Sequence, residues 1–217
     1  MNNPRIKTVE DDVPTFNYSI KEVIKLSREI QPLHTNFDTV INNRKSSRVF
    51  NKITLQQIGD ILWYVAKVRN TFLQDNGYIL THRGTASAGA RHPIDLIINS
   101  PVLSEKDFYY YNPFEHSLNN LDNIKGSAFL EHINDIVKTD NATIIWFVAH
   151  KYRTHAKYID ADSLLWRDAG ALINGIQMVC TAMNLHSCAV GTLGEPFISD
   201  SFKNQEGIFG AGGLLIG

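Results

Sequence analysis

The sequence predicts a protein of the α+β class, because its helical and strand patterns mix without strict alternation along the chain. Two runs rich in β-branched residues, Ile94–Asn99 and Thr143–Ala149, have the length expected of strands. Apolar residues at helical spacing from about Leu164 to Met183 predict the longest helix. A regular strand–helix alternation would instead have indicated the α/β class.

Length, charge and hydropathy limit the classes of function. The 217 residues are sufficient for one domain with its own core, and 43% hydrophobic and 20% charged residues are ordinary for a globular protein. The formal net charge of −1 creates no global attraction for nucleic acid or for an acidic membrane surface. No apolar run is long enough to cross a bilayer. We therefore expect neither a nucleic-acid partner nor a membrane partner.

The cellular compartment is predicted from the N-terminus and the cysteines. Residues Met1–Asp12 lack the apolar centre of a signal peptide. Cys180 and Cys188 are too few for a disulfide scaffold, so we expect buried thiols in a reducing compartment. Both observations indicate a cytoplasmic protein.

The chain divides into a short arm and one domain. Residues 1–17 are polar and contain Pro4 and Pro14, which predicts an N-terminal arm. Residues 18–217 contain no repeat, no low-complexity tract and no interior linker. This range therefore predicts a single domain.

Three helix signals follow the arm. Ser19 and Glu22 have the spacing of a capping box, and apolar residues on one side of 20–27 predict a first helix. A second short apolar face lies at 37–41. Another capping box, Thr54–Gln57, precedes apolar residues at helical spacing and predicts a further helix.

The second half of the domain adds a helix and a strand. Ser127 is a candidate cap for a helix whose apolar residues extend to Val137. Gly170 and Gly175 interrupt the long helical pattern, and a glycine in a helix interior costs about 1 kcal/mol relative to alanine. We therefore expect that face to pack closely against another helix or a cofactor. Gly212–Gly217 predicts a short apolar strand.

A basic cluster at Arg44–Phe50 is the densest chemical signal in the sequence. Three cations and two hydroxyls fall within five residues, which suits an anionic, hydrogen-bonding ligand. A phosphate carries nearly two charges at neutral pH, so it commonly needs more than one cation. The alternative interpretation is a basic helix end, where cations complement the helix dipole.

Four other segments are candidates for ligand contact. The small residues of Thr85–Pro93 allow the backbone to approach a planar ligand, although a tight turn before a strand would look the same. Tyr109–Pro113 with His116 predicts an aromatic loop, or otherwise a surface turn with packed tyrosines. Ala189–Gly194 offers backbone N–H groups, or is an ordinary glycine-bearing loop. Lys157–Tyr158 pairs an amine with a phenol, or is merely a solvated polar pair.

Taken in order, these segments resemble the nitroreductase superfamily of FMN-dependent oxidoreductases, over about residues 40–217. The closer likeness is to the SagB-type and McbC-type azoline dehydrogenases. The Arg-Lys-Ser-x-Arg-x-Phe run at 44–50 is similar to the flavin motif of that branch. The Ala-Ser-Ala-Gly-Ala-x-His-Pro run at 86–93 is similar to its Pro-Ser-Ala-Gly-Ala-x-His-Pro signature. Residues 62–66, 109–118 and 168–170 also resemble elements of the branch.

The resemblance implies a particular architecture. It implies a three-layer fold, in which helices flank a central, mostly antiparallel sheet, and an intertwined homodimer with FMN at the subunit interface. The sequence departs from the family at two points. Ala86 replaces the signature proline, and the late basic residues that commonly touch the phosphate have no counterpart between Leu214 and Gly217.

The resemblance also implies roles for individual residues. One group would hold the FMN phosphate, ribityl chain and pyrimidine edge, a second would cover the flavin from the partner subunit, and a third would face the ring with backbone donors. These groups are Arg44, Lys45, Ser46 and Arg48; Ala86, Ser87, Ala88 and Gly89; and Val190, Gly191 and Thr192. A cation near the pyrimidine edge stabilises the anionic reduced flavin.

Lys157 and Tyr158 would carry the chemistry in the enzymes that the chain resembles. Oxidation of an azoline to an azole removes a proton from the α-carbon and a hydride from the neighbouring carbon. A neighbouring ammonium favours the phenolate of a tyrosine, and burial of a lysine favours its free amine. Either residue could therefore be the base.

Three functions follow from this resemblance. The first is FMN-dependent oxidation of azoline rings in a modified peptide, with a cyclodehydratase as a candidate partner. The second is an NAD(P)H-dependent nitroreductase or flavin reductase that acts on small molecules, and the third is a flavin-free scaffold of a peptide-maturation complex. A metal site is not expected, because His150 and His155 do not share a helical face and neither accompanies a Cys-x-x-Cys pair. Hydrolase chemistry is not expected either, because no serine lies in a Gly-x-Ser-x-Gly elbow.

Overall fold

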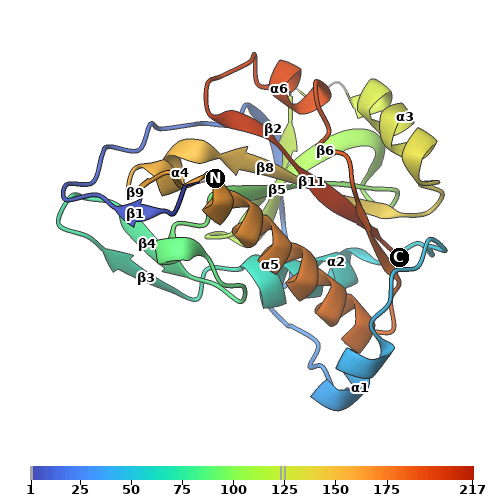
Figure 1. The fold of residues 1–217 in the computed structure, drawn as a ribbon. Coiled ribbons are helices and arrows are strands. Elements are labelled where there is room, and N and C mark those ends of the chain that lie inside the picture. Colours follow the sequence, from blue (N-terminus) through green and yellow to red (C-terminus); the bar gives the residue numbers. More distant parts are fainter. Residues whose placement is uncertain (1, 123, 125) are drawn as a thin grey trace.

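A seven-stranded sheet forms the middle layer of the computed structural model, which describes residues 2–122, 124 and 126–217 (Figure 1). The strand order is β10-β11-β8-β5-β6-β7-β2, and every neighbouring pair is antiparallel. The strands are β2 (Ile20–Lys25), β5 (Ile94–Ser100), β6 (Ser104–Asn112), β7 (Ser117–Leu121), β8 (Thr143–His150), β10 (Ser187–Val190) and β11 (Ile208–Ile216).

Helices cover both faces of this sheet, and two small sheets lie at its side (Figure 1). The small sheets pair β1 (Arg5–Ile6) with β9 (Tyr158–Ile159), and β3 (Asn70–Leu73) with β4 (Ile79–His82). The helices are α1 (Phe37–Asn43), α2 (Leu55–Ala66), α3 (Gly126–Ile136), α4 (Lys151–His155), α5 (Asp162–Ala182) and α6 (Phe197–Ser201), with a 3₁₀ turn η1 (Ala88–Ala90).

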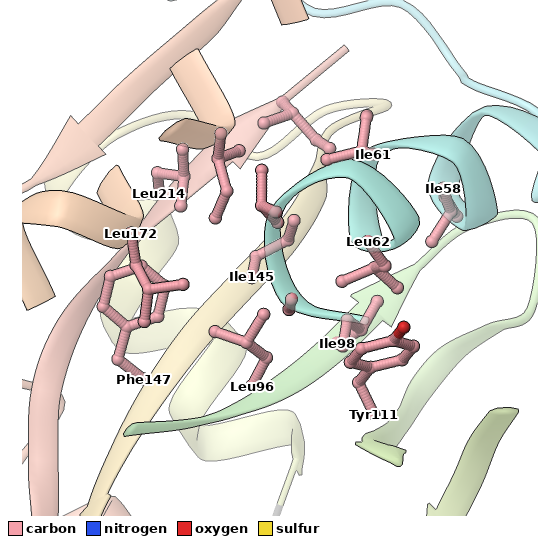
Figure 2. Close-up of a cluster of buried hydrophobic side chains, with 14 of the residues drawn as sticks. Ile58, Ile61, Leu62, Leu96, Ile98, Tyr111, Ile145, Phe147, Leu172 and Leu214 are labelled. Carbon is pink, nitrogen blue, oxygen red and sulfur yellow. The ribbon is translucent and has the colours of Figure 1, made fainter. Parts of the chain in front are cut away.

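The core is divided in two by the sheet. Strands β5 and β8 are buried at every position because helices pack on both of their faces, which explains their continuous apolar sequence. Leu96 and Ile98 enter a core with α2 and α5, shown in Figure 2, whereas Ile97 enters a second core with α3 and α6. This arrangement confirms the predicted α+β class and the three-layer architecture.

Most of the predicted elements are confirmed. The capping box before α2 is complete, because the Thr54 side chain accepts from Gln57 N–H and the Gln57 side chain accepts from Thr54 N–H. The short face at 37–41 forms α1, the long pattern forms α5, and the C-terminal strand is longer than predicted. Helix α3 begins at Gly126, so Ser127 lies within the helix. Both cysteines are buried and free.

The predicted first helix is wrong. Residues 20–25 form β2, an edge strand whose backbone pairs with β7 instead of closing helical turns. Ile20, Val23 and Ile24 are β-branched, so a helix would restrict their rotamers while a strand accommodates them. Pairing with β7 therefore overrides the local capping signal.

The predicted aromatic loop is also wrong in part. Tyr109–Tyr111 lie inside β6, and only the following turn at 113–116 is a loop. Tyr111 is buried, and its hydroxyl lies 2.8 Å from Nδ1 of His116. Since the Nε2 of His116 faces the Ser27 carbonyl at 3.1 Å, the ring donates from Nε2 and accepts at Nδ1. The tyrosine run therefore stabilises the turn from within the sheet.

The N-terminal residues lie against the domain. Strand β1 pairs with β9, and the Phe16 ring packs on Tyr18 and Phe202. Met1 of the expected arm and residues 123 and 125 lie outside the described residues. The division into an arm (1–17) and one domain (18–217) stays a prediction. No helix in the described part of the chain combines the length and the apolarity needed to span a membrane.

Candidate functional site

The loop at residues 86–90, which we call the Ser-Ala-Gly loop, is attached to α5 by Asp168. The Ser87 hydroxyl donates to Asp168 Oδ2 at 2.5 Å, and the Ala88 N–H donates to Asp168 Oδ1 at 3.1 Å. The same hydroxyl accepts from His92 N–H at 2.8 Å. Burial raises the pKa of the Asp168 carboxyl, and the hydrogen bonds from Ser87 and Ala88 oppose that rise. One buried carboxylate thus fixes the position of the loop.

Lys157 and Tyr158 lie directly against this loop. Gly89 has φ +61°, and a Cβ at this position would stand 2.7 Å from Tyr158 Oη and 3.2 Å from Lys157 Cδ. Nζ of Lys157 lies 5.9 Å from the centre of the Tyr158 ring. Only glycine satisfies both the backbone conformation and the contact. The fold therefore brings together two groups that the sequence analysis singled out separately.

An open hollow adjoins the same loop. It has a volume of about 650 Å³, and its lining includes Ala86, Ser87, Arg83 and His92. Nε of Arg83 donates to Thr81 Oγ1 at 3.1 Å. Burial first, and then the neighbouring Arg83, lowers the pKa of His92 to about 3, so this imidazole is neutral at pH 7. Arg83 was not predicted as a lining residue, because no local sequence pattern accompanies it.

The predicted phosphate-binding residues lie at the other end of the domain. Arg44 follows α1, and the segment 44–48 runs beside the edge strand β10, where Ser47 N–H donates to Ser187 O at 2.9 Å. Arg44, Lys45 and Arg48 form no ion pair with any of the described residues. We call residues 44–48 the basic segment. Its position after α1 also agrees with the alternative of a basic helix end.

The third predicted group, Val190–Thr192, lies at the far end of the same strand. Val190 is buried, whereas Gly191 is exposed, and a Cβ at Gly191 would meet nothing within 4 Å. Oγ1 of Thr192 lies 3.3 Å from His132 Nε2. Because β10 rises about 3.3 Å per residue, Ser187 and Val190 are about 10 Å apart. An elongated ligand along this strand could contact both the basic segment and Gly191.

Two sets of predicted site residues lie apart within one protomer. The first set is the Ser-Ala-Gly loop with Lys157 and Tyr158, and the second is the basic segment. The Ser-Ala-Gly loop, which contacts Lys157 and Tyr158, is bonded to Asp168 of α5, whereas Lys45 shares a hollow with Asn184. The helical backbone from Asp168 to Ala182, where α5 ends two residues before Asn184, spans about 21 Å at 1.5 Å per residue. Within one protomer the Ser-Ala-Gly loop and the basic segment therefore lie toward opposite ends of α5.

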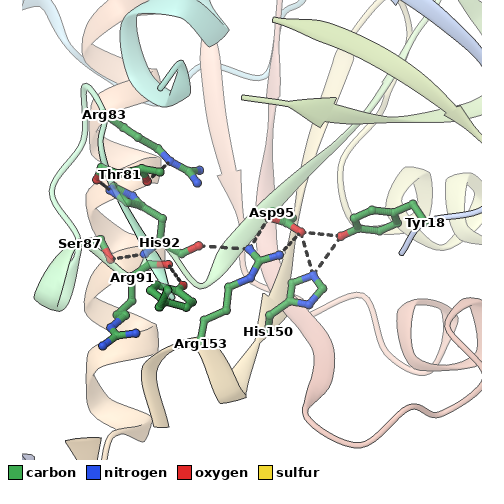
Figure 3. Close-up of polar contacts among 10 residues, drawn as sticks. Tyr18, Thr81, Arg83, Ser87, Arg91, His92, Asp95, His150 and Arg153 are labelled. Atoms are coloured by element: carbon green, nitrogen blue, oxygen red, sulfur yellow. Dashed lines mark hydrogen bonds and ion pairs between the residues drawn. The ribbon is translucent and has the colours of Figure 1, made fainter. Parts of the chain in front are cut away.

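A buried polar network that the sequence analysis also missed lies next to the first set (Figure 3). Asp95 accepts from both terminal nitrogens of Arg153, at 2.6 and 2.9 Å, and from Tyr18 at 2.9 Å. His150 Nε2 is 2.9 Å from the same carboxylate. Burial alone would raise the pKa of Asp95, but Arg153 and His150 hold it well below its usual range. The signal in the sequence was a lone carboxylate inside an apolar strand.

A metal centre finds no support in the side chains. Within the described ranges, no three His, Cys, Asp or Glu side chains are grouped so that they could hold a metal ion. His150 faces Asp95, and His155 Nε2 lies 2.9 Å from the exposed Asp162. The two histidines therefore serve separate contacts.

The fold is shared with solved structures, although no protein-family model and no curated protein matches the sequence. A Ralstonia eutropha protein assigned as a nitroreductase is 19% identical, with a TM-score of 0.64, and the match covers 96% of this chain and 97% of that one. An Anabaena variabilis protein assigned likewise is 17% identical, with a TM-score of 0.64 over 98% of this chain and 42% of that one. A chain of the E. coli microcin synthetase McbBCD complex with truncated pro-MccB17 bound is 15% identical, with a TM-score of 0.57 over 91% and 77%. This chain therefore has the fold of nitroreductase-family proteins.

Proposed function

We propose that this protein is an FMN-dependent oxidoreductase that oxidises azoline rings to azoles in a modified peptide. The observation that carries the proposal is the contact of Lys157 and Tyr158 with Gly89 of the Ser-Ala-Gly loop. The Lys157 and Tyr158 side chains lie against the loop of small residues, and the same loop lines a hollow of about 650 Å³ at Ala86, Ser87 and Ala90. The shared fold with a chain of the microcin synthetase complex supports the same branch of the resemblance.

The residues of the basic segment suit an FMN phosphate. Arg44, Lys45 and Arg48 have no carboxylate partner among the described residues, so their donors are available to an anion. The open space over Gly191 leaves room for a planar ring to approach the backbone. When bound, FMN would accept a hydride from the substrate.

The separation of the basic segment from the Ser-Ala-Gly loop supports a homodimer. A flavin held by the basic segment of one copy lies at the opposite end of α5 from its own Ser-Ala-Gly loop. The loop and the Lys157–Tyr158 pair that complete the site would therefore come from the second copy. This two-copy arrangement is the composite site that we propose.

Lys157 and Tyr158 would take the proton from the α-carbon of the azoline. Both side chains are half-buried, and Nζ of Lys157 lies 5.9 Å from the centre of the Tyr158 ring. A correctly placed base is commonly worth 10²–10⁴-fold in rate, as an order of magnitude. The proton leaves the substrate carbon for the base, and the electron pair of the adjacent C–H bond leaves as hydride.

Flavin binding and chemistry can be tested separately. We expect purified protein supplied with FMN to absorb near 450 nm, roughly the flavin maximum. Replacing Lys157 by Met and Tyr158 by Phe should abolish azole formation and leave FMN bound. Arg48→Ala should weaken FMN binding about tenfold, because a charge-assisted contact is lost, whereas Arg167→Ala on the exposed face of α5 should not. Full turnover in the double variant would exclude the proposed roles.

The second candidate is an NAD(P)H-dependent nitroreductase or flavin reductase. It is favoured by the fold shared with the nitroreductase-assigned proteins from Ralstonia eutropha and Anabaena variabilis. Rapid bleaching of the bound flavin by NAD(P)H under argon would select this function. Colourless protein that refuses added FMN would instead select the flavin-free scaffold.

A further inference from the structure

The arm provides an unexpected cover for the Lys157–Tyr158 pair. Strand β1 adds to the edge of β9, with Ile6 opposite Tyr158 and Arg5 opposite Ile159 (Figure 1). The Lys7 N–H donates to Lys157 O at 2.9 Å, and the Asp11 N–H donates to Ala156 O at 2.9 Å. The backbone of the pair is thus paired with the chain's own N-terminal residues.

A cluster of donors around one carboxylate lies beside this strand pair. Glu10 contacts the Arg91 guanidinium, accepts from Asn76 Nδ2 at 3.2 Å, and lies 3.8 Å from Lys157 Nζ. Arg91 is held in place, because its guanidinium stacks 4.3 Å above the centre of the Tyr78 ring. Donors of Arg91, Asn76 and Lys157, from three separate segments of the chain, therefore surround the Glu10 carboxylate.

Glu10 of the arm pairs with only part of the Arg91 guanidinium. The side chain of Arg91 is 1% exposed, yet its Nε and Nη1 have no hydrogen-bond partner among the described residues. A buried guanidinium with unused donors is unfavourable, and a carboxylate that approached it bidentately would be bound better. Glu10, constrained by the strand pairing, does not supply that second contact.

Residues 5–9 of the arm bury little side-chain surface, in contrast to Phe16, which packs on Tyr18 and Phe202. Ile6 is 70% exposed and Val9 is 77% exposed, so the strand buries little apolar surface. Its attachment at β9 consists of a few main-chain hydrogen bonds, the contacts of Glu10 and a solvent-accessible ion pair of Arg5 with Asp160 at 3.6 Å. A two-stranded pair of this kind has little stability of its own, so a competing strand can displace it.

We propose that the edge of β9, with Arg91, Asn76 and Lys157, is a binding site for an extended acidic segment of the substrate peptide, and that the arm occupies it as a displaceable competitor. The mode is strand addition, in which main-chain hydrogen bonds give affinity and a side-chain pocket gives specificity. Displacement of the arm by the peptide would bring the substrate beside Lys157 and Tyr158. This inference rests on the proposed function only in calling the ligand a substrate.

The test uses the arm's own sequence as the probe. A fluorescently labelled peptide with the sequence of residues 2–12 is titrated against the full chain, and binding is followed by anisotropy. In the wild type the attached arm competes at an effective concentration on the order of millimolar, so we expect weak binding. Lys7→Pro removes the N–H that bonds Lys157 O, and should increase affinity for the labelled peptide about tenfold.

Two matched controls isolate the main-chain bond and the carboxylate. Lys7→Ala loses the side chain but keeps the N–H, so it should bind the peptide as the wild type does. Glu10→Gln in the protein should loosen the arm in the same direction as Lys7→Pro. A labelled peptide with glutamine at the Glu10 position should bind the Lys7→Pro variant about tenfold more weakly, because a charged partner of Arg91 is lost.

The outcomes separate this inference from the proposed function. Equal affinity of the wild type and Lys7→Pro, equal affinity of the two peptides, or no binding to Lys7→Pro would overturn the peptide site. The titration needs neither flavin nor turnover. Peptide binding by a protein that refuses FMN would therefore leave this site standing while the proposed function failed.

Discussion

Gly89 is the residue at which backbone conformation and chemistry meet most closely. Its φ of +61° is disfavoured for any residue with a Cβ, and the space beside it is filled by Tyr158 and Lys157. The Ser-Ala-Gly loop is in turn attached to Asp168. A Cβ added at Gly89 should therefore displace the proposed catalytic pair and lower activity.

We expect Gly89→Ala to reduce stability by about 1–2 kcal/mol and to reduce azole formation as well, because the new Cβ displaces Tyr158. Gly77→Ala is the matched control, since Gly77 has φ +79° with nothing within 4 Å of a Cβ. It should carry the backbone cost without an effect on turnover. Thermal melting and azole formation, measured in both variants, check the prediction. An equal loss of turnover in the two would argue against the contact.

The buried pair of Asp95 and Arg153 makes a second prediction for single residues. Arg153→Met leaves the carboxylate buried without its guanidinium, which should cost about 3–5 kcal/mol. Arg167→Met, on an exposed position of α5, should change stability by less than about 0.5 kcal/mol. Urea unfolding at pH 7 measures both. A loss for Arg153→Met no larger than that of the control would mean that the pair contributes little.

Helix α5 contains two interior glycines, Gly170 and Gly175, that differ in the space around them. At Gly175 a Cβ would lie 2.6 Å from Thr85 Cγ2, so the expected close packing is confirmed there. At Gly170 a Cβ would meet nothing within 4 Å of the protomer, so the expected close packing stays a prediction there. Thr85 cannot move freely, because its N–H and hydroxyl both donate to Val65 O at 3.0 Å.

The two glycines should therefore respond oppositely to alanine. Gly170→Ala should stabilise the protein by about 1 kcal/mol through helix propensity alone. Gly175→Ala should destabilise it by about 1–3 kcal/mol, because the helix is overpacked against Thr85. Chemical unfolding of the two variants gives the comparison. Destabilisation by Gly170→Ala would indicate that a second protomer covers that position.

Acid should weaken the whole molecule through several groups acting in the same direction. Burial lowers the pKa of His92 to about 3 and of His116 to about 4. Both pKa values lie below the ordinary histidine value near 6.5. Between the folded-state pKa and 6.5 the unfolded chain binds more protons than the folded protein, so the free energy of unfolding falls as pH decreases. The lowered pKa of Asp95 adds a further loss as pH falls through about 4.

His116→Asn tests one component of this acid response. Asparagine tolerates the positive φ of 54° at this turn but does not titrate. The variant should be less stable at pH 7, yet lose less stability between pH 6.5 and 4, by up to about 1.4 kcal/mol per pH unit for one proton. Unfolding free energies at several pH values check the slope. An unchanged slope would mean that His116 is protonated in the fold.

The two-copy site makes a prediction at the scale of the assembly. A phosphate-grip variant, Arg44→Ala with Arg48→Ala, and the Lys157→Met, Tyr158→Phe variant should each be inactive alone. After random subunit exchange, half of the dimers are mixed, and each contains one intact composite site. The mixture should therefore regain about a quarter of wild-type activity. If both sets served the same protomer's site, mixing would restore nothing.

The sequence predicted two kinds of element well. One kind has a local signal, such as a capping box or a helical apolar pattern, and the other is a strand with helices packed on both of its faces. The capping box at Thr54–Gln57 and the long pattern of α5 are of the first kind, and the apolar runs of β5 and β8 are of the second. Strand β2 was missed because its partner β7 lies about a hundred residues further along the chain. Asp95 and Arg153 were missed because ion pairing between distant residues leaves no periodic signal.

The class of fold and the chemical identity of the candidate groups can be read from short stretches of sequence, because apolar periodicity and residue type are local properties. Which of these groups meet depends on the folded molecule. It brings Gly89 to Tyr158, joins Glu10 to Arg91, and leaves the basic segment at the opposite end of α5. Contacts of this kind depend on how the sheet and helices pack, and packing is set by the whole chain at once.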